Sequence, residues 1–286
     1  MSNDSGVNRY ALKVFYLGDR YLGFQTQRNN RTVQEFIINA LRKSGYIDDE
    51  KAAKFGYSGR TDRYVHSLGQ VIAFNSVNKL IIPKINSYLP EDIRFYAYAR
   101  VSPDFSPRYH AIYRHYKYLT WTNDLDIKIM KKASKEFLGE HNFRLLSKRG
   151  LSNESINKNT VRKIFEIKIE QIKDGLLVID VIGESFLYEM VRRIVGVLLA
   201  VGRGELNTHE IKNYFDLNMA NKIKIRRAPI KTGGDLILFE CKYDIDFKYD
   251  EYSTKRIRNY LFDLFKDHYI KSQSIKTMFK AFNQKL

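Results

Sequence analysis

Residues 161–201 read VRKIFEIKIEQIKDGLLVIDVIGESFLYEMVRRIVGVLLAV, and this stretch decides the class of fold. Two runs rich in Val, Ile, Leu and Phe, residues 161–172 and 176–182, are typical of β-strands. The Asp-Gly step between them favours a tight hairpin turn. Over residues 186–201 the apolar side chains recur at helical spacing, and Gly202 closes the pattern. The stretch therefore predicts an antiparallel hairpin followed by a helix with a broad buried face.

The rest of the chain mixes the same two patterns. Further strands are predicted at residues 9–16, 71–74, 93–101, 116–121 and 236–243. Further helices are predicted after a capping box formed by Thr32 and Glu35, over residues 124–138, and from Tyr252 onward. Residues 144–159 are polar and predict an exposed loop. Because hairpin signals outnumber long helical crossovers, the sequence predicts an α+β fold on a largely antiparallel sheet.

The charge balance points to a polyanionic partner. The 286 residues contain 49 Lys and Arg against 32 Asp and Glu, a net charge of +17. Neutralisation of phosphates by such a surplus drives much of nucleic-acid binding. The 20 Tyr and 18 Phe offer rings on which unpaired bases can stack. An ordinary basic protein from a lysine-rich proteome is the alternative.

Cysteine content and the apolar segments bear on the compartment. Cys241 is the only cysteine, so no disulfide can form within the chain, as is usual in a reducing cytoplasm. The first residues lack the basic and apolar regions of a signal peptide. The longest apolar run, residues 194–201, is too short to span a bilayer. We therefore expect a soluble cytoplasmic protein with no membrane contact.

Several common site types are absent from the sequence. The six histidines have no metal-ligand spacing. Phosphate-binding and dinucleotide-binding glycine motifs are missing, and so is the Gly-x-Ser-x-Gly motif of esterases. We therefore expect neither a metal nor another cofactor.

One polar loop between two predicted strands remains as a candidate for chemistry. It contains Arg60, Thr61 and Asp62, and loops fixed between strands are good places to present reactive groups. From the residues alone, Asp62 is more readily explained as a turn former whose carboxylate accepts nearby backbone N–H groups.

A family resemblance favours the chemical interpretation. Gly59-Arg60-Thr61-Asp62-x-x-Val65-His66-x-x-Gly69-Gln70-Val71 resembles the catalytic motif of the TruA family of pseudouridine synthases. Further blocks keep the family's order over residues 9–243: Tyr21-x-Gly23-Phe24-Gln25-x-Gln27 with Thr32-Val33-Gln34-Glu35, Leu89-Pro90-x-Asp92-Ile93, Phe105-x-x-Arg108-Tyr109-x-Ala111-x-x-Arg114-x-Tyr116-x-Tyr118, and Phe186-Leu187-Tyr188-x-Met190-Val191-Arg192-x-Ile194-Val195-Gly196.

The resemblance implies a role for four residues. Asp62 corresponds to the family's catalytic carboxylate, which acts as nucleophile at the ribose C1′ or as base at C2′. Arg192 corresponds to the arginine that pairs with it, and Tyr116 to the tyrosine that stacks on the target uracil. Arg60 corresponds to an arginine that helps fill the space of the flipped nucleotide. The alternatives are a surface position for Arg192, a packing role for Tyr116, and a phosphate contact or a salt bridge within the loop for Arg60.

Other positions are expected to touch RNA or to depart from the family pattern. Gln25, Arg28 and Arg31 lie in a segment that resembles RNA-contacting parts of the family. Arg63-Tyr64 stands where the family usually has Ala or Lys followed by Gly. Because Tyr disfavours positive φ, we expect either a differently bent loop or an extra ring from Tyr64 beside the RNA.

The resemblance also implies an architecture and a reaction. It implies the pseudouridine synthase fold, with two α/β halves on a largely antiparallel mixed sheet, a cleft between them, and a homodimer. We expect an N-terminal half at residues 1–104, a C-terminal half at 105–246 and a basic helical tail at 247–286. The implied reaction is isomerisation of uridine at positions 38, 39 and 40 of the tRNA anticodon stem-loop. A related synthase acting on other RNA sites and a non-catalytic RNA-binding protein are the alternatives.

Overall fold

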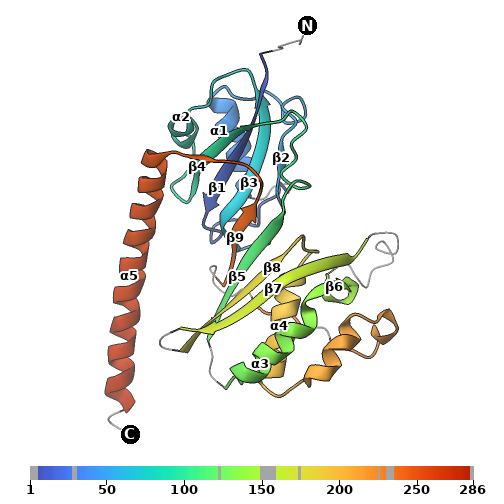
Figure 1. Cartoon of the computed structure of the whole chain (residues 1–286). Helices are drawn as coiled ribbons and strands as arrows, with labels where there is room; N and C mark the ends of the chain where they lie inside the picture. Colours follow the sequence, from blue (N-terminus) through green and yellow to red (C-terminus); the bar gives the residue numbers. More distant parts are fainter. Residues whose placement is uncertain are drawn as a thin grey trace.

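A computed structural model describes residues 6–27, 31–121, 124–148, 159–172, 175–224, 226–229 and 235–283 (Figure 1). The strands are β1 (Asn8–Tyr16), β2 (Gly56–Tyr57), β3 (His66–Ser76), β4 (Ile93–Val101), β5 (Tyr113–Trp121), β6 (Gly139–Asn142), β7 (Val161–Gln171), β8 (Leu176–Gly183), β9 (Leu236–Lys242) and β10 (Lys248–Tyr249). The α-helices are α1 (Val33–Lys43), α2 (Ile82–Asn86), α3 (Ile127–Ser134), α4 (Met190–Gly202) and α5 (Glu251–Asn283).

One sheet runs through both halves of the molecule. Its order is β10-β4-β1-β3-β9-β5-β8-β7-β6, and β2 pairs with β3 beside this path. Within the described part of the chain every strand pair is antiparallel except β3 with β9. That parallel pair is short, His66 with Ile237 and Ser67 with Leu238. The predicted α+β fold on a largely antiparallel mixed sheet is confirmed.

Two hydrophobic cores lie on this sheet. In the N-terminal half, alternate side chains of β1 (Tyr10, Leu12, Val14 and Tyr16) pack in one core with residues of α1 and α2. In the C-terminal half, α3 and α4 lie along β7 and β8, and their apolar side chains form the second core (Figure 1). Ala11, which points to the other face of β1, belongs to that second core.

The helix starts differ from the sequence prediction. Thr32 precedes α1, but its side chain makes no capping hydrogen bond, so the predicted capping box is wrong. The carbonyls of Gly23 and Phe24 instead accept hydrogen bonds from the first N–H groups of the helix, at 3.2 and 2.8 Å. The helix predicted from residue 186 begins at Met190, because Glu189 has a left-handed φ of 62° that α-helical backbone does not allow.

Other predicted segments are partly outside the described residues. Residues 173 and 174, between β7 and β8, lie outside the described residues. Residues 149–158 of the predicted polar loop also lie outside them. The start of that loop is not exposed throughout, because Arg144–Leu146 form a 3₁₀ turn whose leucines are buried. The helix predicted at 124–138 is α3 followed by a 3₁₀ turn, Lys135–Phe137.

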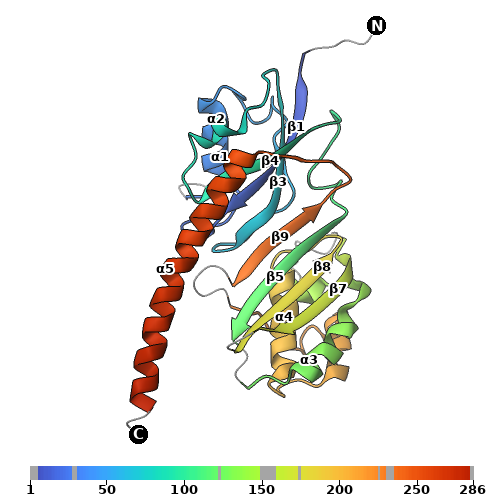
Figure 2. The same cartoon turned by 60° about the vertical axis from the view of Figure 1, so that its left-hand side comes forward.

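The tail predicted to be helical is α5, which leaves the body of the molecule (Figures 1 and 2). Its first turns pack on the sheet, where Ile257 joins Phe15, Tyr96 and Ala97 in a small third cluster. Arg256 also pairs with Glu91 at 3.2 Å. Over residues 261–282 only Leu264 and Gln273 are half-buried, and all other side chains are exposed. No helix in the described part of the chain is long and apolar enough to cross a membrane.

Candidate active site

The loop between β2 and β3 is held by backbone contacts with the loop that follows β1. Phe24 donates a backbone hydrogen bond of 3.1 Å to the Thr61 carbonyl. A Cβ at Gly23, whose φ is +106°, would lie 2.8 Å from that carbonyl oxygen. The hydroxyl groups of Thr61 and buried Tyr16 share a hydrogen bond of 2.8 Å. These contacts fix the position of Asp62, the next residue, relative to the sheet.

Asp62 and Arg192 form an ion pair although they are 130 positions apart in the chain (192 − 62). Arg192 Nη1 lies 3.6 Å from Asp62 Oδ2, and the two side chains are 11% and 21% exposed. The Arg192 Nε donates to the Ala228 carbonyl at 3.1 Å, which orients the guanidinium. Asp62 comes from the N-terminal half and Arg192 from α4 of the C-terminal half, so the site lies where the halves meet.

The environment of Asp62 acts on its charge in opposite directions. Burial raises the pKa of its carboxyl group above the usual value, whereas the Arg192 guanidinium lowers it. The Glu189 carboxylate raises the same pKa, and the Lys148 ammonium lowers it. Asp62 is therefore a partly buried carboxylate whose ionised form depends on its arginine neighbour.

Glu189 is part of the site and was missed by the sequence interpretation. Its side chain is only 3% exposed and lies between three guanidinium groups. Its carboxylate lies 2.7 Å from Arg227 Nη1, 3.3 Å from Arg193 Nη2 and 3.6 Å from Arg192 Nη1. The pairs Arg192-Arg193 and Arg226-Arg227 in the sequence were the available signal, because a buried carboxylate between such pairs compensates their charge.

Tyr116 lies on β5 with its side chain 8% exposed. Its ring meets the ring of Phe186 edge-on, with 5.2 Å between centroids and 85° between planes. Burial raises the pKa of the Tyr116 hydroxyl, and the nearby Asp62 charge adds to this. Tyr118, two residues on, is buried on the same face and donates to the Pro229 carbonyl at 2.7 Å. The structure thus places Tyr116 near Asp62 and Tyr118 under the segment that holds Arg192.

The described residues that were predicted to touch RNA differ in exposure and in their neighbours. Arg60 is exposed and Gln25 is half-buried. Arg31 is exposed and its guanidinium lies over the rings of Tyr21 and Phe36, at 5.4 and 5.0 Å from the centroids. Arg28 lies outside the described residues.

Tyr64 adopts the backbone conformation of a glycine. Its φ is +69°, so the expectation of a differently bent loop is wrong. The reason is the close approach of Gly18, whose Cβ, if present, would lie 2.7 Å from the Tyr64 carbonyl carbon and 2.3 Å from the Val65 oxygen. This contact holds the backbone in place. The half-buried Tyr64 ring stacks under the Arg63 guanidinium, 4.3 Å from the ring centroid.

The site contains no arrangement of metal ligands. Among the residues that the structure describes, no group of three or more His, Cys, Asp or Glu side chains could hold a metal ion. The described side chains of the site are the carboxylates of Asp62 and Glu189, the Arg192 guanidinium between them, and the rings of Tyr116 and Phe186.

Comparisons with known proteins match this arrangement to one family. A family model described as tRNA pseudouridine synthase matches residues 133–244, which include Arg192 but not Asp62. A protein of Methanobrevibacter smithii named tRNA pseudouridine synthase A is 37% identical, covering 96% of this chain and 97% of that protein. A protein of the same name from Archaeoglobus fulgidus is 35% identical, covering 96% and 98%. A solved structure of an archaeal box H/ACA Nop10–Cbf5 complex matches 66% of this chain and 44% of that chain at 16% identity, with a TM-score of 0.33 that supports no conclusion.

The extent and level of identity of these relatives decide the family. The alignment with each of these two relatives covers nearly the full length of both proteins. The chain therefore belongs to the TruA family of tRNA pseudouridine synthases.

Proposed function

We propose that this enzyme converts uridine to pseudouridine at positions 38, 39 and 40 of the tRNA anticodon stem-loop, with Asp62 as its catalytic carboxylate. The observation that carries the assignment of Asp62 is its ion pair with Arg192, 3.6 Å long and formed between the two halves of the molecule. A turn-forming aspartate needs no such partner. The net charge of +17 supports a nucleic-acid substrate.

The proposed chemistry requires an ionised Asp62. As a nucleophile the carboxylate attacks the ribose C1′, and as a base it removes the proton from C2′. Either route breaks the bond from C1′ to N1 of uracil. The base then rotates and rejoins C1′ through C5, which loses its proton while N1 gains one. Arg192 favours the ionised form of Asp62 before the carboxylate reacts, and again when the carboxylate is released.

We propose that Tyr116 acts through its ring rather than its hydroxyl group. In the described part of the chain no hydrogen bond to this hydroxyl is present, whereas the ring packs against Phe186 beside the site. Tyr116→Phe should therefore retain both tRNA binding and product formation, and Tyr116→Ala should lose them. Loss of product with Tyr116→Phe would assign an essential role to the hydroxyl.

The test of the function uses unmodified tRNA transcripts and chemical labelling that maps pseudouridine. Wild-type protein should modify positions 38–40, and Asp62→Ala should form no product although it still folds. Modification only at other positions would favour a related synthase. Binding without any modification would favour the RNA-binding alternative, and product from Asp62→Ala would overturn the assignment of Asp62.

We also propose that the enzyme is a cytoplasmic homodimer, and the exposed apolar side chains of α5 support the dimer. Leu261, Phe265, Ile275, Phe279 and Phe282 lie on the side of α5 that buries Ile257 further up, and each is 38–71% exposed. Exposed apolar stripes of this length mark protein contacts, and a helix gains most of its stability from packing. Residues 261–268 carry Asp263, Lys266 and Asp267, a formal net charge of −1, whereas residues 271–280 carry three Lys and no acidic residue, which favours antiparallel pairing of two copies.

Light scattering behind a sizing column tests this proposal. Phe279→Ala with Phe282→Ala should convert a dimer into a monomer. Phe262→Ala is the control, because Phe262 is 63% exposed but lies on another side of the helix. A wild-type monomer, or a dimer that survives the double substitution, would contradict the pairing. The division at residues 1–104, 105–246 and 247–286 remains a proposal. One core, formed by residues 10–95, supports it, whereas the second core combines Ala11, Val65, Val71 and Ala73 with residues of the C-terminal half.

A further inference from the structure

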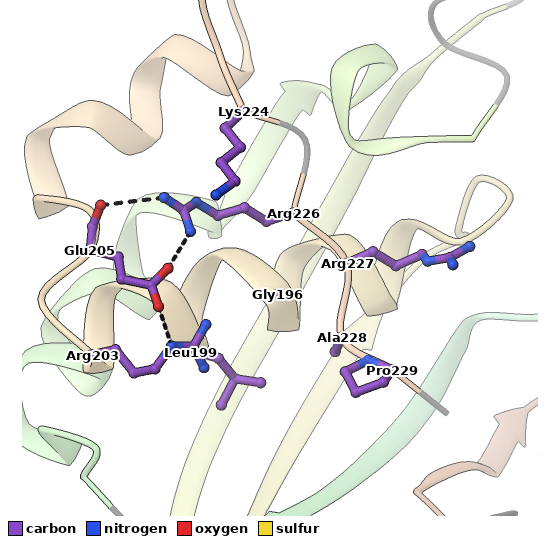
Figure 3. Close-up of a pocket in the computed structure, with 9 residues that line it drawn as sticks. All are labelled: Gly196, Leu199, Arg203, Glu205, Lys224, Arg226, Arg227, Ala228 and Pro229. Carbon is purple, nitrogen blue, oxygen red and sulfur yellow. Dashed lines mark hydrogen bonds and ion pairs between the residues drawn. The ribbon is translucent and has the colours of Figure 1, made fainter. Parts of the chain in front are cut away.

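A basic cavity lies along α4 (Figure 3). Its volume is about 250 Å³. The residues that line it come from α4 and from the segments that follow it: Gly196, Leu199, Arg203, Glu205, Lys224, Arg226, Arg227, Ala228 and Pro229. The Arg227 side chain extends away from the cavity toward Glu189, so the cations that face it are Arg203, Lys224 and Arg226 (Figure 3).

The cavity has more positive than negative charge. Glu205 is its one acidic lining residue, and it accepts from Arg226 Nη1 at 2.6 Å and from Arg203 Nε. Lys224 points toward the Arg226 guanidinium (Figure 3), and its ammonium makes no hydrogen bond or ion pair within the described residues. The Arg226 side chain is 13% exposed, and its Nε is buried without a partner among the described residues. Like charges that converge in this way favour an anionic ligand.

A purely structural role does not explain all of these contacts. The Arg203–Glu205–Arg226 ion pairs tie the end of α4 to residues 224–229. Lys224 adds nothing to that link, and it brings a second cation close to Arg226. The placement of Lys224 therefore needs another explanation.

The cavity is linked to the candidate active site through Ala228. Ala228, one of its lining residues, bonds to Arg192 twice, through the Arg192 Nε and through the Arg192 backbone carbonyl at 2.8 Å. Gly196 follows Arg192 by one helical turn, about 6 Å along the axis. A Cβ at Gly196 would lie 2.7 Å from the Arg227 nitrogen, so glycine lets this segment lie directly on α4. An RNA strand whose target nucleotide is at Asp62 could therefore reach the cavity within a few nucleotides.

We propose that this cavity binds a backbone phosphate of the substrate tRNA, a few nucleotides from the target uridine. Lys224 and Arg226 are the phosphate ligands, and Glu205 holds Arg226 in place. The inference rests on tRNA being the substrate. The phosphate contact fixes the register of the RNA strand, so that one uridine rather than its neighbour enters the site.

Lys224→Gln tests the proposal without breaking the ion pairs of Glu205. Lys222→Gln is the matched control, since Lys222 is an exposed lysine two residues before Lys224 but does not line the cavity. We expect Lys224→Gln to weaken tRNA binding about five- to tenfold at 0.1 M salt and to reduce the slope of log Kd against log salt by about one. Lys222→Gln should change binding less than twofold. Equal effects of the two substitutions would overturn the proposal.

A chemically altered substrate identifies the phosphate. A set of anticodon stem-loops is made, each with one backbone phosphate replaced by a neutral methylphosphonate. The affinity of the wild-type protein should fall for the stem-loop in which one particular linkage near the target uridine is neutral. At that linkage Lys224→Gln should lose no further affinity, whereas Lys222→Gln should lose as much as wild type. Additive losses at every linkage would refute a phosphate contact by Lys224. Wild type that binds but forms no pseudouridine would instead refute the proposed function, which keeps the two failures distinguishable.

Discussion

Tyr64 carries backbone strain that a substitution can release. An L-residue in the left-handed region costs about 1–2 kcal/mol, and Tyr64 has a φ of +69° in the loop that contains Asp62. Glycine has no such cost, although at an ordinary position it is about 0.5–1 kcal/mol less favourable than alanine. We compare Tyr64→Gly with Tyr64→Ala, because both remove the ring and its contact with Arg63 and they differ only in the backbone.

The left-handed conformation should reverse the usual order of the two residues. Tyr64→Gly should exceed Tyr64→Ala in the free energy of unfolding by about 1 kcal/mol, or roughly 2–4 °C in Tm for a chain of this size. The measurement is thermal unfolding followed by circular dichroism. The same pair at Arg63, whose φ is not positive, is the control and should show alanine as the more stable. If alanine equals or exceeds glycine at position 64, the argument from backbone strain is refuted.

Three further predictions concern the groups around Asp62. Gly23→Ala should lower kcat about 100-fold or more, because its Cβ would lie 2.8 Å from the Thr61 carbonyl and displace the loop; Gly45→Ala has a similar φ of +75° but nothing within 4 Å, and should keep full activity. Glu189→Gln should move the acid limb of kcat/KM to lower pH, since the Glu189 carboxylate raises the pKa of Asp62 and ionised Asp62 is the active form; an unchanged limb, or one at higher pH, would contradict this coupling. Arg192→Ala should abolish product formation in single-turnover assays, whereas Arg193→Ala should retain much more of it. Each substitution removes a nearly buried partner of Glu189 and should lower the free energy of unfolding by about 3–5 kcal/mol, so stability does not separate the two variants. Equal product formation by the two variants would remove the assignment of Arg192.

The sequence was most informative where a pattern repeats along an element. Alternation in β1 and the apolar spacing in α4 predict elements that the structure contains, although burial extends further than one face: residues on both faces of β1 are buried, and so is all of α4 except Arg192. Thr32 shows where a local rule fails. Thr32 and Glu35 satisfy the pattern of a capping box, yet the chain that folds back at Gly23 and Phe24 supplies the acceptors first. Tertiary contacts of this kind leave no trace in the residues near the helix.

The residues of the site that were predicted belong to sequence motifs, whereas the one that was missed depends on tertiary contacts. Asp62, Tyr116 and Arg192 were found through motifs, and Asp62 and Arg192 then prove to be within ion-pair distance. Glu189 was not found, because its role depends on Arg227, 38 residues on, and on a left-handed backbone at the start of α4. That conformation turns its carboxylate to the arginines and makes α4 begin late.

A helix beginning at residue 186 would therefore change more than the boundary of α4. The left-handed Glu189 breaks the helical pattern immediately before Met190, and from this position its buried carboxylate contacts Arg192, Arg193 and Arg227 together. Glu189 and Asp62 share Arg192, since both carboxylates lie 3.6 Å from the same Nη1 atom. Burial raises the pKa of Asp62, and the Glu189 charge raises it further while both acids share one arginine. A shared arginine leaves a carboxylate less fully neutralised than a dedicated one, and this suits the role of nucleophile or base that we propose for Asp62.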